Sequence, residues 1–273
     1  CSLPSWLSRF RRRTFRSKVL PLPQELLTYL ESDSIFLSSS AGQDDDTTSE
    51  GSWTSQGDVE EEQKEREQEE QEVEETPSEN FIQFTREIQQ AIDELGGVVF
   101  PKLSWSAPTD ARWIATTGNL RCTRADEVLL LLKASDRLSH DLALAKSLSS
   151  PTELSLILRK WYDLHPSMEF RCFLRPDSSS PIIGISQRDP AYYDYLESLR
   201  DTLNNRIITF LQDHIIPALM GPGQEGEGMG HVVDVYHEQS SGKVWLVDIN
   251  PWDPSSTLPL LFSWPDLLET SEP

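Results

Sequence analysis

The sequence is poor in cysteine and in the features that mark membrane or secreted proteins. It contains only Cys1, Cys122 and Cys172, and no pair of them has the C-x-x-C spacing. This pattern favours reduced thiols, with Cys172 buried in a strand, over a disulfide framework or a zinc site. No apolar run reaches the roughly 18 residues that span a bilayer. We therefore expect a cytoplasmic protein without a membrane partner, and we interpret the basic stretch 9–18 as a strand or surface segment.

The common nucleotide-binding loops are missing as well. There is no G-x-x-x-x-G-K-[ST] and no G-x-G-x-x-G, and the glycine-rich stretch 221–230 has two acids and no lysine or arginine. We interpret that stretch as a flexible connection. The five histidines are scattered, and no nucleophile stands beside a base. Any bound nucleotide would therefore be held by sheet surfaces and not by a helix N-terminus.

Basic charge is scarce overall, because the formal net charge is −21. Residues 44–79 hold 16 acidic and 2 basic residues, so −14 of this charge lies there and only −7 elsewhere. Such a balance disfavours direct nucleic-acid binding. We expect residues 38–77 to be a disordered acidic insertion, with an arm that touches a basic partner as the functional alternative. Because the chain starts at Cys1 and not at Met, we also expect a fragment whose first strand is clipped.

Apolar periodicity predicts a mixture of helices and antiparallel strands. Residues 2–6 have the composition of a turn. We expect helices at 24–30, at 79–95 with Ser78 as the cap and Gly96-Gly97 as the end, at 126–133 with Thr123 as the cap, at 193–216 and at 264–268. We expect strands at 15–20, 35–37, 98–100, 153–161, 168–174 and 181–187, with the last three forming an antiparallel meander.

A predicted hairpin at 231–250 carries the most specific chemical signal. If Gln239 pairs with Lys243 around a turn that contains Gly242, then Asp234 lies directly opposite Asp248. Two carboxylates this close in apolar strands repel one another, and a cation between them removes that cost. Asn250 projects from the same face as Asp248, which completes an oxygen ligand set for Mg²⁺. The alternatives are solvated acids on an ordinary hairpin, or a metal site that uses His231 and His237.

Basic residues at strand ends supply the opposite charge. They are Lys102, Arg159, Lys160, Arg171 and Arg188. Facing the acidic hairpin, they would hold a polyphosphate by charge-assisted hydrogen bonds, together with the metal. For Arg171 the alternative is a structural ion pair with Glu169 on the same strand face.

Several long motifs together resemble the cell-division-cycle protein 123 family. They are FPKLSWSAPTDARWIA (100–115), LLLLKASD (129–136), LILRKWYDLHPSMEFRCFLR (156–175), IGISQRDP (183–190), VVDVYHEQSSGKVWLVDINPW (232–252) and LPLLFSW (258–264). The resemblance implies an α+β ATP-grasp fold, in which two α+β subdomains with antiparallel sheets clamp a nucleotide. It implies a truncated first part at 1–37, the insertion at 38–77, one subdomain at 78–152 and a second at 153–273 that carries the magnesium hairpin.

The same resemblance implies an ATP- and Mg²⁺-binding chaperone, more a binding protein than an enzyme. Such a chaperone promotes assembly of the heterotrimeric eukaryotic translation initiation factor 2 by binding its gamma subunit, which supports translation initiation and cell cycle progression. By motif, the residues toward ATP are Lys102, Trp105, Ala107, Leu158, Arg159, Lys160, Arg171 and Arg188. Asp234, Asp248 and Asn250 would hold Mg²⁺ and contact the nucleotide through it.

Two other classes of function stay open at this point. A carboxylate–amine ligase of the ATP-grasp type would need an anchor for its substrate, for which Arg175 or Lys133 are candidates. A purely structural binding module would need no nucleotide. We expect a monomer, and an acidic C-terminal tail is an expected further segment of the family pattern.

Overall fold

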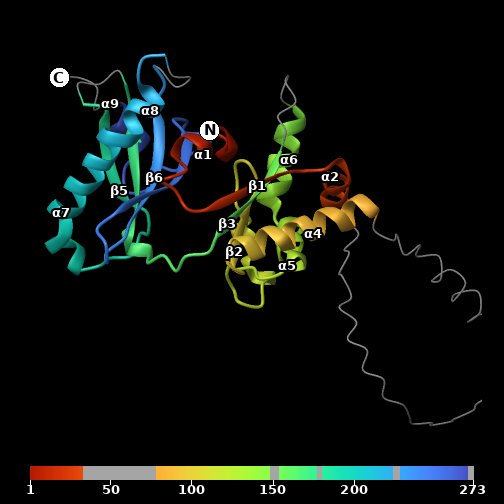
Figure 1. Ribbon diagram of the computed structural model, residues 1–273. Coiled ribbons are helices and arrows are strands. Elements are labelled where there is room, and N and C mark those ends of the chain that lie inside the picture. Colours follow the sequence, from red (N-terminus) through yellow and green to blue (C-terminus); the bar gives the residue numbers. More distant parts are fainter. Residues whose placement is uncertain (33–77, 148–153, 177–179, 224–227, 270–273) are drawn as a thin grey trace, which may run out of the picture.

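The structure of the protein, a computed structural model, describes residues 1–32, 78–147, 154–176, 180–223 and 228–269 (Figure 1). The expected acidic insertion at 38–77 and the expected strand at 35–37 lie outside these residues. Two antiparallel sheets organise the described chain, and each sheet has its own set of helices and its own hydrophobic core. No helix within these ranges has the length and apolarity to cross a membrane.

The first sheet has three strands in the order β1-β3-β2, with β3 in the middle. These strands are β1 (Ser17–Pro21), β2 (Val99–Lys102) and β3 (Ser155–Lys160). The helices beside this sheet are α2 (Gln24–Glu31), α4 (Glu79–Glu94), α5 (Ala125–Lys133) and α6 (Asp136–Ser147), and the short 3₁₀ helix η1 spans Thr109–Ile114 (Figure 1). Strand β3 is buried on both faces from Ser155 to Arg159, because Leu156 and Leu158 pack in the first core and Ile157 packs in the second.

The helix caps of this half follow from local sequence. Ser78 accepts a hydrogen bond from the amide of Phe81 at 3.2 Å, as predicted for the start of α4. Gly96 and Gly97 have φ values of +100° and +82° and end that helix. The cap of α5 differs from the prediction, because Thr123 does not accept from the helix. The Glu127 carboxylate instead accepts from the amide and the hydroxyl of Thr123, at 2.6 and 3.1 Å, and from the amide of Arg124 at 3.1 Å.

The second sheet has four strands in the order β5-β4-β6-β7. They are β4 (Glu169–Leu174), β5 (Ile182–Gln187), β6 (His231–His237) and β7 (Val244–Pro251), and the 3₁₀ turn η2 (Pro166–Met168) precedes β4. Helices α1 (Leu3–Phe10), α7 (Tyr195–Phe210) and α8 (Ile216–Met220) lie with this sheet, as does α9 (Trp264–Glu269) (Figure 1). Buried side chains of α1 and α7, such as Trp6 and Phe210, join its core.

Three expectations about this architecture are wrong. Residues 3–10 form helix α1 and not a turn, because Leu3, Trp6 and Phe10 recur at helical spacing and are buried together. The meander of three strands does not form: β3 pairs with β1 and β2, while β4 and β5 pair in the other sheet. The chain between β3 and β4 therefore crosses from one sheet to the other. Helix α6 was not expected at all.

The long helix after residue 193 is confirmed, with an irregular end. Helix α7 continues into a π-helical turn, η3 (Leu211–Ile215), and then into α8 as far as Met220. Pro217 lies inside α8, although a helix end was expected there. Proline lacks the backbone N–H that an α-helix uses, and the wider π turn just before it accommodates this loss.

The β6–β7 hairpin reaches the predicted pairing by a different route. Val244, not Lys243, is the first residue of β7, and it pairs with His237, so the turn is longer than expected. The register then shifts by one residue between Val235 and Asp234. Val235 pairs with Leu246 and Asp234 pairs with Asp248, so Val247 is left as a bulge and the predicted pairing of Asp234 is regained. The opposition of Asp234 and Asp248 is therefore confirmed.

The turn of this hairpin needs a glycine. Gly242 has φ +68°, and an added Cβ would lie 1.6 Å from Arg206 Nη1. We expect Gly242→Ala to lower the free energy of unfolding by about 1–2 kcal/mol, because the left-handed region is unfavourable for residues with a Cβ. Urea unfolding measures this loss. Gly118→Ala should lose a similar amount through its φ of +64° alone, since open space surrounds it, so a larger loss in Gly242→Ala reports the contact with Arg206. Wild-type stability of Gly242→Ala contradicts this turn geometry.

Candidate nucleotide site between two sheets

A single row of polar side chains crosses the whole four-stranded sheet. Ser186 pairs with Arg171, Arg171 with Asp234, and Asp234 with Asp248, one residue from each strand. Cross-strand partners project from the same face, so these four side chains lie side by side. Their strand neighbours, such as Val233 and Val235, point into the apolar core on the other face. Alternation along the strands thus separates a polar face from the core.

Asp234 lies at the centre of this row and is held by three donors. The guanidinium of Arg171 binds it with two hydrogen bonds, from Nε to Oδ1 at 2.7 Å and from Nη2 to Oδ2 at 2.9 Å. Arg188 Nη1 lies 2.5 Å from Oδ2, and the amide of Asn250 donates to the same oxygen at 3.3 Å. Asp234 is only 2% exposed, so these pairs are desolvated. The alternative considered for Arg171 was an ion pair with Glu169, but Arg171 pairs with Asp234, and Glu169 lies 3.5 Å from Arg188 Nε.

Asp248 connects the two sheets. Lys102, the last residue of β2, reaches across and places its Nζ 2.8 Å from Asp248 Oδ2. The Lys102 side chain is 3% exposed and that of Asp248 is 23% exposed, so the carboxylate lies where the polar face opens to solvent. Sequence predicted both residues for one site although they are 146 positions apart, and the structure brings them together.

A second connection runs through Arg159 of β3. Its Nη1 donates to the carbonyl of the bulged residue Val247 at 2.7 Å, and its Nη2 donates to Thr14 Oγ1 at 2.9 Å. Thr14 in turn donates to the carbonyl of Leu246. Arg159 Nε is buried without a partner among the described residues. Arg159 therefore fixes the strand that carries Asp248, and Thr14 is a member of the site that sequence reasoning missed.

The turn that follows Lys102 is held by a buried carboxylate. Asp141 of α6 accepts hydrogen bonds from the amide and the hydroxyl of Ser106, both at 2.8 Å. This shapes residues 103–107, which include Trp105 and Ala107, two residues expected near ATP. Asp141 was missed because α6 itself was not predicted, and a lone aspartate carries no local signal of such a contact.

The other residues expected at the site lie around its margin. Trp105 and Ala107 are half-buried, and Trp105 packs against the first core. Leu158 is fully buried in that core. Lys160 points to the opposite side of β3 from Arg159, and its Nζ lies 5.9 Å from the centre of the Tyr162 ring. Their expected contacts with a nucleotide stay predictions.

Burial and charge shift the ionisation of several groups here. Burial raises the pKa of Glu169 and of Asp141, against the lowering effect of their hydrogen bonds or cationic neighbours. Burial also lowers the pKa of Arg159, and the Asp248 charge opposes this. The Asp234 carboxylate raises the pKa of Arg188 further. The two sheets therefore enclose a region of low effective dielectric in which charges act strongly.

Some of the side-chain oxygens at this site are suitable ligands for a magnesium ion. Asp248 has an exposed carboxylate edge, the Asn250 amide oxygen accepts no hydrogen bond within the described chain, and Asp234 lies next to both. Carboxylate and amide oxygens suit Mg²⁺, which usually retains waters and phosphate oxygens as further ligands. Asp234 already binds two guanidinium groups, so Asp248 and Asn250 offer the freer oxygens. Among the described residues, no cluster of three His, Cys, Asp or Glu forms a protein-only metal cage.

The alternative metal site with histidines does not form. His231 and His237 lie at the two ends of β6 and on the face opposite to Asp234, because odd and even positions of a strand alternate. His231 Nδ1 contacts the carbonyl of Met229 at 3.1 Å, and His237 Nε2 contacts Arg206 at 3.3 Å. Both rings are part of the packing of the second sheet.

The central ion pair yields a stability prediction. Asp234→Ala would leave Arg171 buried without its carboxylate, and breaking such a pair costs about 3–5 kcal/mol. We expect that loss in urea unfolding without added ligand. Asn250→Ala is the matched control, since it removes one hydrogen bond of 3.3 Å and should cost about 1 kcal/mol. Equal stability of the two variants would show that the pair is unimportant for folding.

The histidines of β6 yield a pH prediction. Burial lowers the pKa of both His231 and His237, so the folded protein binds their protons less readily than the unfolded chain does. Below about pH 6.5 the unfolded chain binds more protons at these histidines than the folded chain does. The free energy of unfolding therefore falls as the pH is lowered. In urea unfolding, His237→Gln should show a smaller fall than wild type between pH 7 and 5.5. His140→Gln, on the exposed side of α6, should keep the full fall, and an unchanged fall in His237→Gln contradicts the prediction.

Comparisons with known proteins match almost the entire chain. The family model described as D123 matches residues 6–273. A translation initiation factor eIF2 assembly protein of Sclerotinia sclerotiorum is 41% identical over 100% of this chain and 65% of its own length. The protein of that name in Kluyveromyces lactis is 38% identical over 98% of this chain and 75% of its own length. The chain thus spans about two thirds of the length of the first of these relatives.

Solved structures agree with these matches. The structure of Cdc123 from Schizosaccharomyces pombe superposes with a TM-score of 0.71 at 35% identity, over 98% of this chain and 90% of that one. A C-terminally truncated form of the same protein gives 0.72 at 34% identity, over 100% of this chain and 90% of that one. The expected α+β fold with antiparallel sheets is confirmed. The chain therefore belongs to the D123 family, the family of the solved Cdc123 structures, as its motifs predicted.

Proposed function

We propose that this protein binds Mg-ATP between its two sheets and, in that state, promotes assembly of eukaryotic translation initiation factor 2 by binding its gamma subunit. The observation that carries the nucleotide part is the polar row with Asp234 and Asp248, faced by Lys102 from the other sheet. The assembly part is supported by the names of relatives that cover the whole chain.

Each charged side chain has a distinct part in this proposal. Lys102, Arg171 and Arg188 bind phosphate oxygens, for which ammonium and guanidinium donors are suited. Asp248 and Asn250, with Asp234 behind them, hold the Mg²⁺ that neutralises the remaining phosphate charge. Because these cations are paired with carboxylates in the free protein, Mg-ATP supplies both an anion for the cations and a cation for the carboxylates.

The residues around the margin complete the site. Leu158, Arg159 and Lys160 of β3 lie along the adenine side, and Trp105 and Ala107 border it from the turn after β2. Arg159 acts on the site through Val247 and Thr14, so we assign it a positioning role.

The geometry favours a binding protein over a ligase. Arg175, one anchor considered for a ligase substrate, stacks on Trp252 at 5.8 Å and donates to the carbonyl of Leu268. Lys133, the other anchor, donates to the carbonyls of Tyr29 and Ser32 in the first helical layer. Both side chains hold structure away from the polar row. Burial raises the pKa of Cys122 to about 12 and that of Cys172 still more, so neither thiol is a ready nucleophile.

Thermal unfolding with and without Mg-ATP tests the proposed nucleotide site. A ligand that binds only the folded state at 100 times its Kd adds about 2.7 kcal/mol, which raises Tm by roughly 5 °C or more for a chain of this size. Asn250→Ala should keep the unliganded Tm within a few degrees and lose most of the rise, because it removes a proposed Mg²⁺ ligand and leaves the ion pairs of Asp234 and Asp248 in place. A wild-type protein that shows no rise with millimolar Mg-ATP would refute the nucleotide site.

Binding of the gamma subunit tests the second part of the proposal. Wild-type protein should retain purified gamma subunit of eukaryotic translation initiation factor 2 in a pull-down with Mg-ATP, and Asn250→Ala should retain several-fold less. Equal retention by both proteins would separate partner binding from the nucleotide. Asp234→Ala is unsuitable here, because its loss of stability would mimic a loss of binding.

A further inference from the structure

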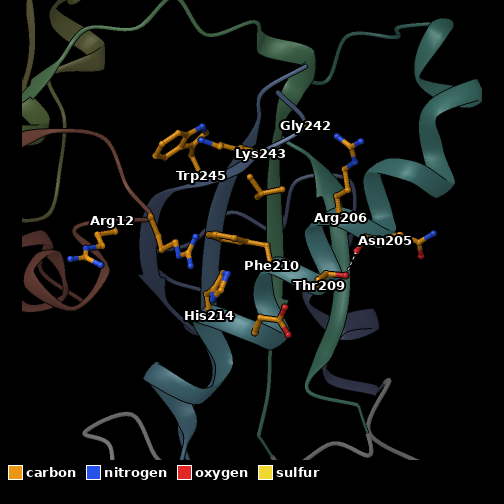
Figure 2. Close-up of a pocket in the computed structure, with 12 residues that line it drawn as sticks. Arg12, Asn205, Arg206, Thr209, Phe210, His214, Gly242, Lys243 and Trp245 are labelled. Atoms are coloured by element: carbon orange, nitrogen blue, oxygen red, sulfur yellow. Dashed lines mark hydrogen bonds between the residues drawn. The ribbon is translucent and has the colours of Figure 1, made fainter. Parts of the chain in front are cut away.

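A basic cavity lies beside β7, along the outer edge of the four-stranded sheet and apart from the polar row. It has a volume of about 420 Å³. The end of α1, helix α7 and the β6–β7 turn supply its walls, and Figure 2 shows Phe210 in the middle of the residues that line it. Its cationic side chains are those of Arg12, Arg13, Arg206 and Lys243. This volume suits a few side chains of a bound ligand.

In the part of the chain that the structure describes, the cations of this cavity are not held in ion pairs. Arg12, Arg13, Arg206 and Lys243 make no ion pair within the described part of the chain. Elsewhere on the surface, lysines and arginines do find carboxylates, as Lys18 does with Glu94. The chain as a whole has a net charge of −21, so these cations at one cavity form a local surface of positive charge.

The walls of the cavity are fixed by specific contacts. The amide of Leu246 donates to the carbonyl of Arg13 at 2.7 Å, which holds the chain after α1 against β7. Arg206 lies directly over Gly242, where there is no side chain to displace it, and contacts His237. The cations are therefore presented from three separate elements at a fixed spacing, which favours binding of a defined ligand.

The floor of the cavity is aromatic. Phe210 is buried at 7% exposure and packs edge-on against His214, with ring centres 5.6 Å apart. Trp245 forms the opposite side and lies near Lys243, whose Nζ is 5.9 Å from its ring (Figure 2). Asn205 and Thr209 add polar groups at the rim. The cavity thus combines positive charge with an apolar surface.

The basic surface continues beyond this cavity. A second hollow of about 710 Å³ is lined by Ser8, Arg9 and Arg11 and shares Arg12 and Arg13 with the first. An extended ligand could place charges over this second hollow while it fills the first. The dimensions therefore suit a segment of several residues better than a single small anion.

We propose that this surface binds an acidic peptide segment of a partner protein that carries one aromatic or large apolar side chain. The carboxylates pair with the arginines, and the apolar side chain packs on Phe210 and Trp245. Asp213 lines the same cavity as Phe210, so this part of the cavity suits the uncharged side chain of the peptide and not an anion, while the arginines take the carboxylates. This inference is independent of the nucleotide site.

Fluorescence anisotropy with a labelled synthetic peptide tests the proposal. The probe is a twelve-residue peptide of aspartate and glutamate with one central phenylalanine. We expect Arg12→Glu and Arg206→Glu each to weaken binding by at least tenfold, and 300 mM salt to weaken it relative to 50 mM. Replacing the phenylalanine of the peptide by serine should weaken binding several-fold. Arg86→Glu, an equal charge change on the exposed side of α4, should bind like wild type.

Several results would overturn the proposal. They are a wild-type protein that does not bind the peptide, an Arg12→Glu variant that binds as wild type does, and tighter binding of a single-stranded RNA of equal length that the same variants abolish. Arg12 is exposed and has no partner in the described chain, so its replacement should leave Tm unchanged. The rise of Tm with Mg-ATP should also persist in Arg12→Glu, which separates this surface from the nucleotide site.

Discussion

The paired hydrogen bonds between Arg171 and Asp234 are the interaction on which the second sheet and its polar face depend. A carboxylate that is 2% exposed is tolerable only because a bidentate guanidinium holds it. Arg188 and Asn250 also donate to this carboxylate, both to Oδ2 of Asp234. Apolar side chains of similar size would fold as well, so the retention of charges here is understandable if they serve a ligand.

A site between two sheets also needs the sheets to be held at a set distance. Lys102 with Asp248, and Arg159 with the carbonyl of Val247, form two bridges only one residue apart on β7. The bulge at Val247 turns its carbonyl toward Arg159 and at the same time sets Asp248 opposite Asp234. One irregular residue thus satisfies both the pairing within a sheet and the contact between sheets.

Apolar periodicity and turn residues were enough to predict the strands, the main helices and the pairing of Asp234 with Asp248. The turn length was off by one residue, and the bulge cancelled this error because each moves the register by one position. Sheet membership was the weak point. β3 has the same alternation in either sheet, and only its distant partners β1 and β2 decide where it belongs. Asp141 and Thr14 were missed for a similar reason, since their roles arise from contacts 35 or more positions away.

The position of α1 has a consequence for how the protein folds during synthesis. Trp6 and Phe10 are buried in the core of the second sheet, and the amide of Leu246 donates to the carbonyl of Arg13, although β7 follows α1 at a long distance in the sequence. Because domains generally fold as they emerge from the ribosome, the apolar face of α1 stays uncovered until β7 has been translated. The first sheet can close earlier, since β1, β2 and β3 are complete by residue 160. The apolar face of α1 is therefore exposed in the nascent chain for longer than the core residues of the first sheet.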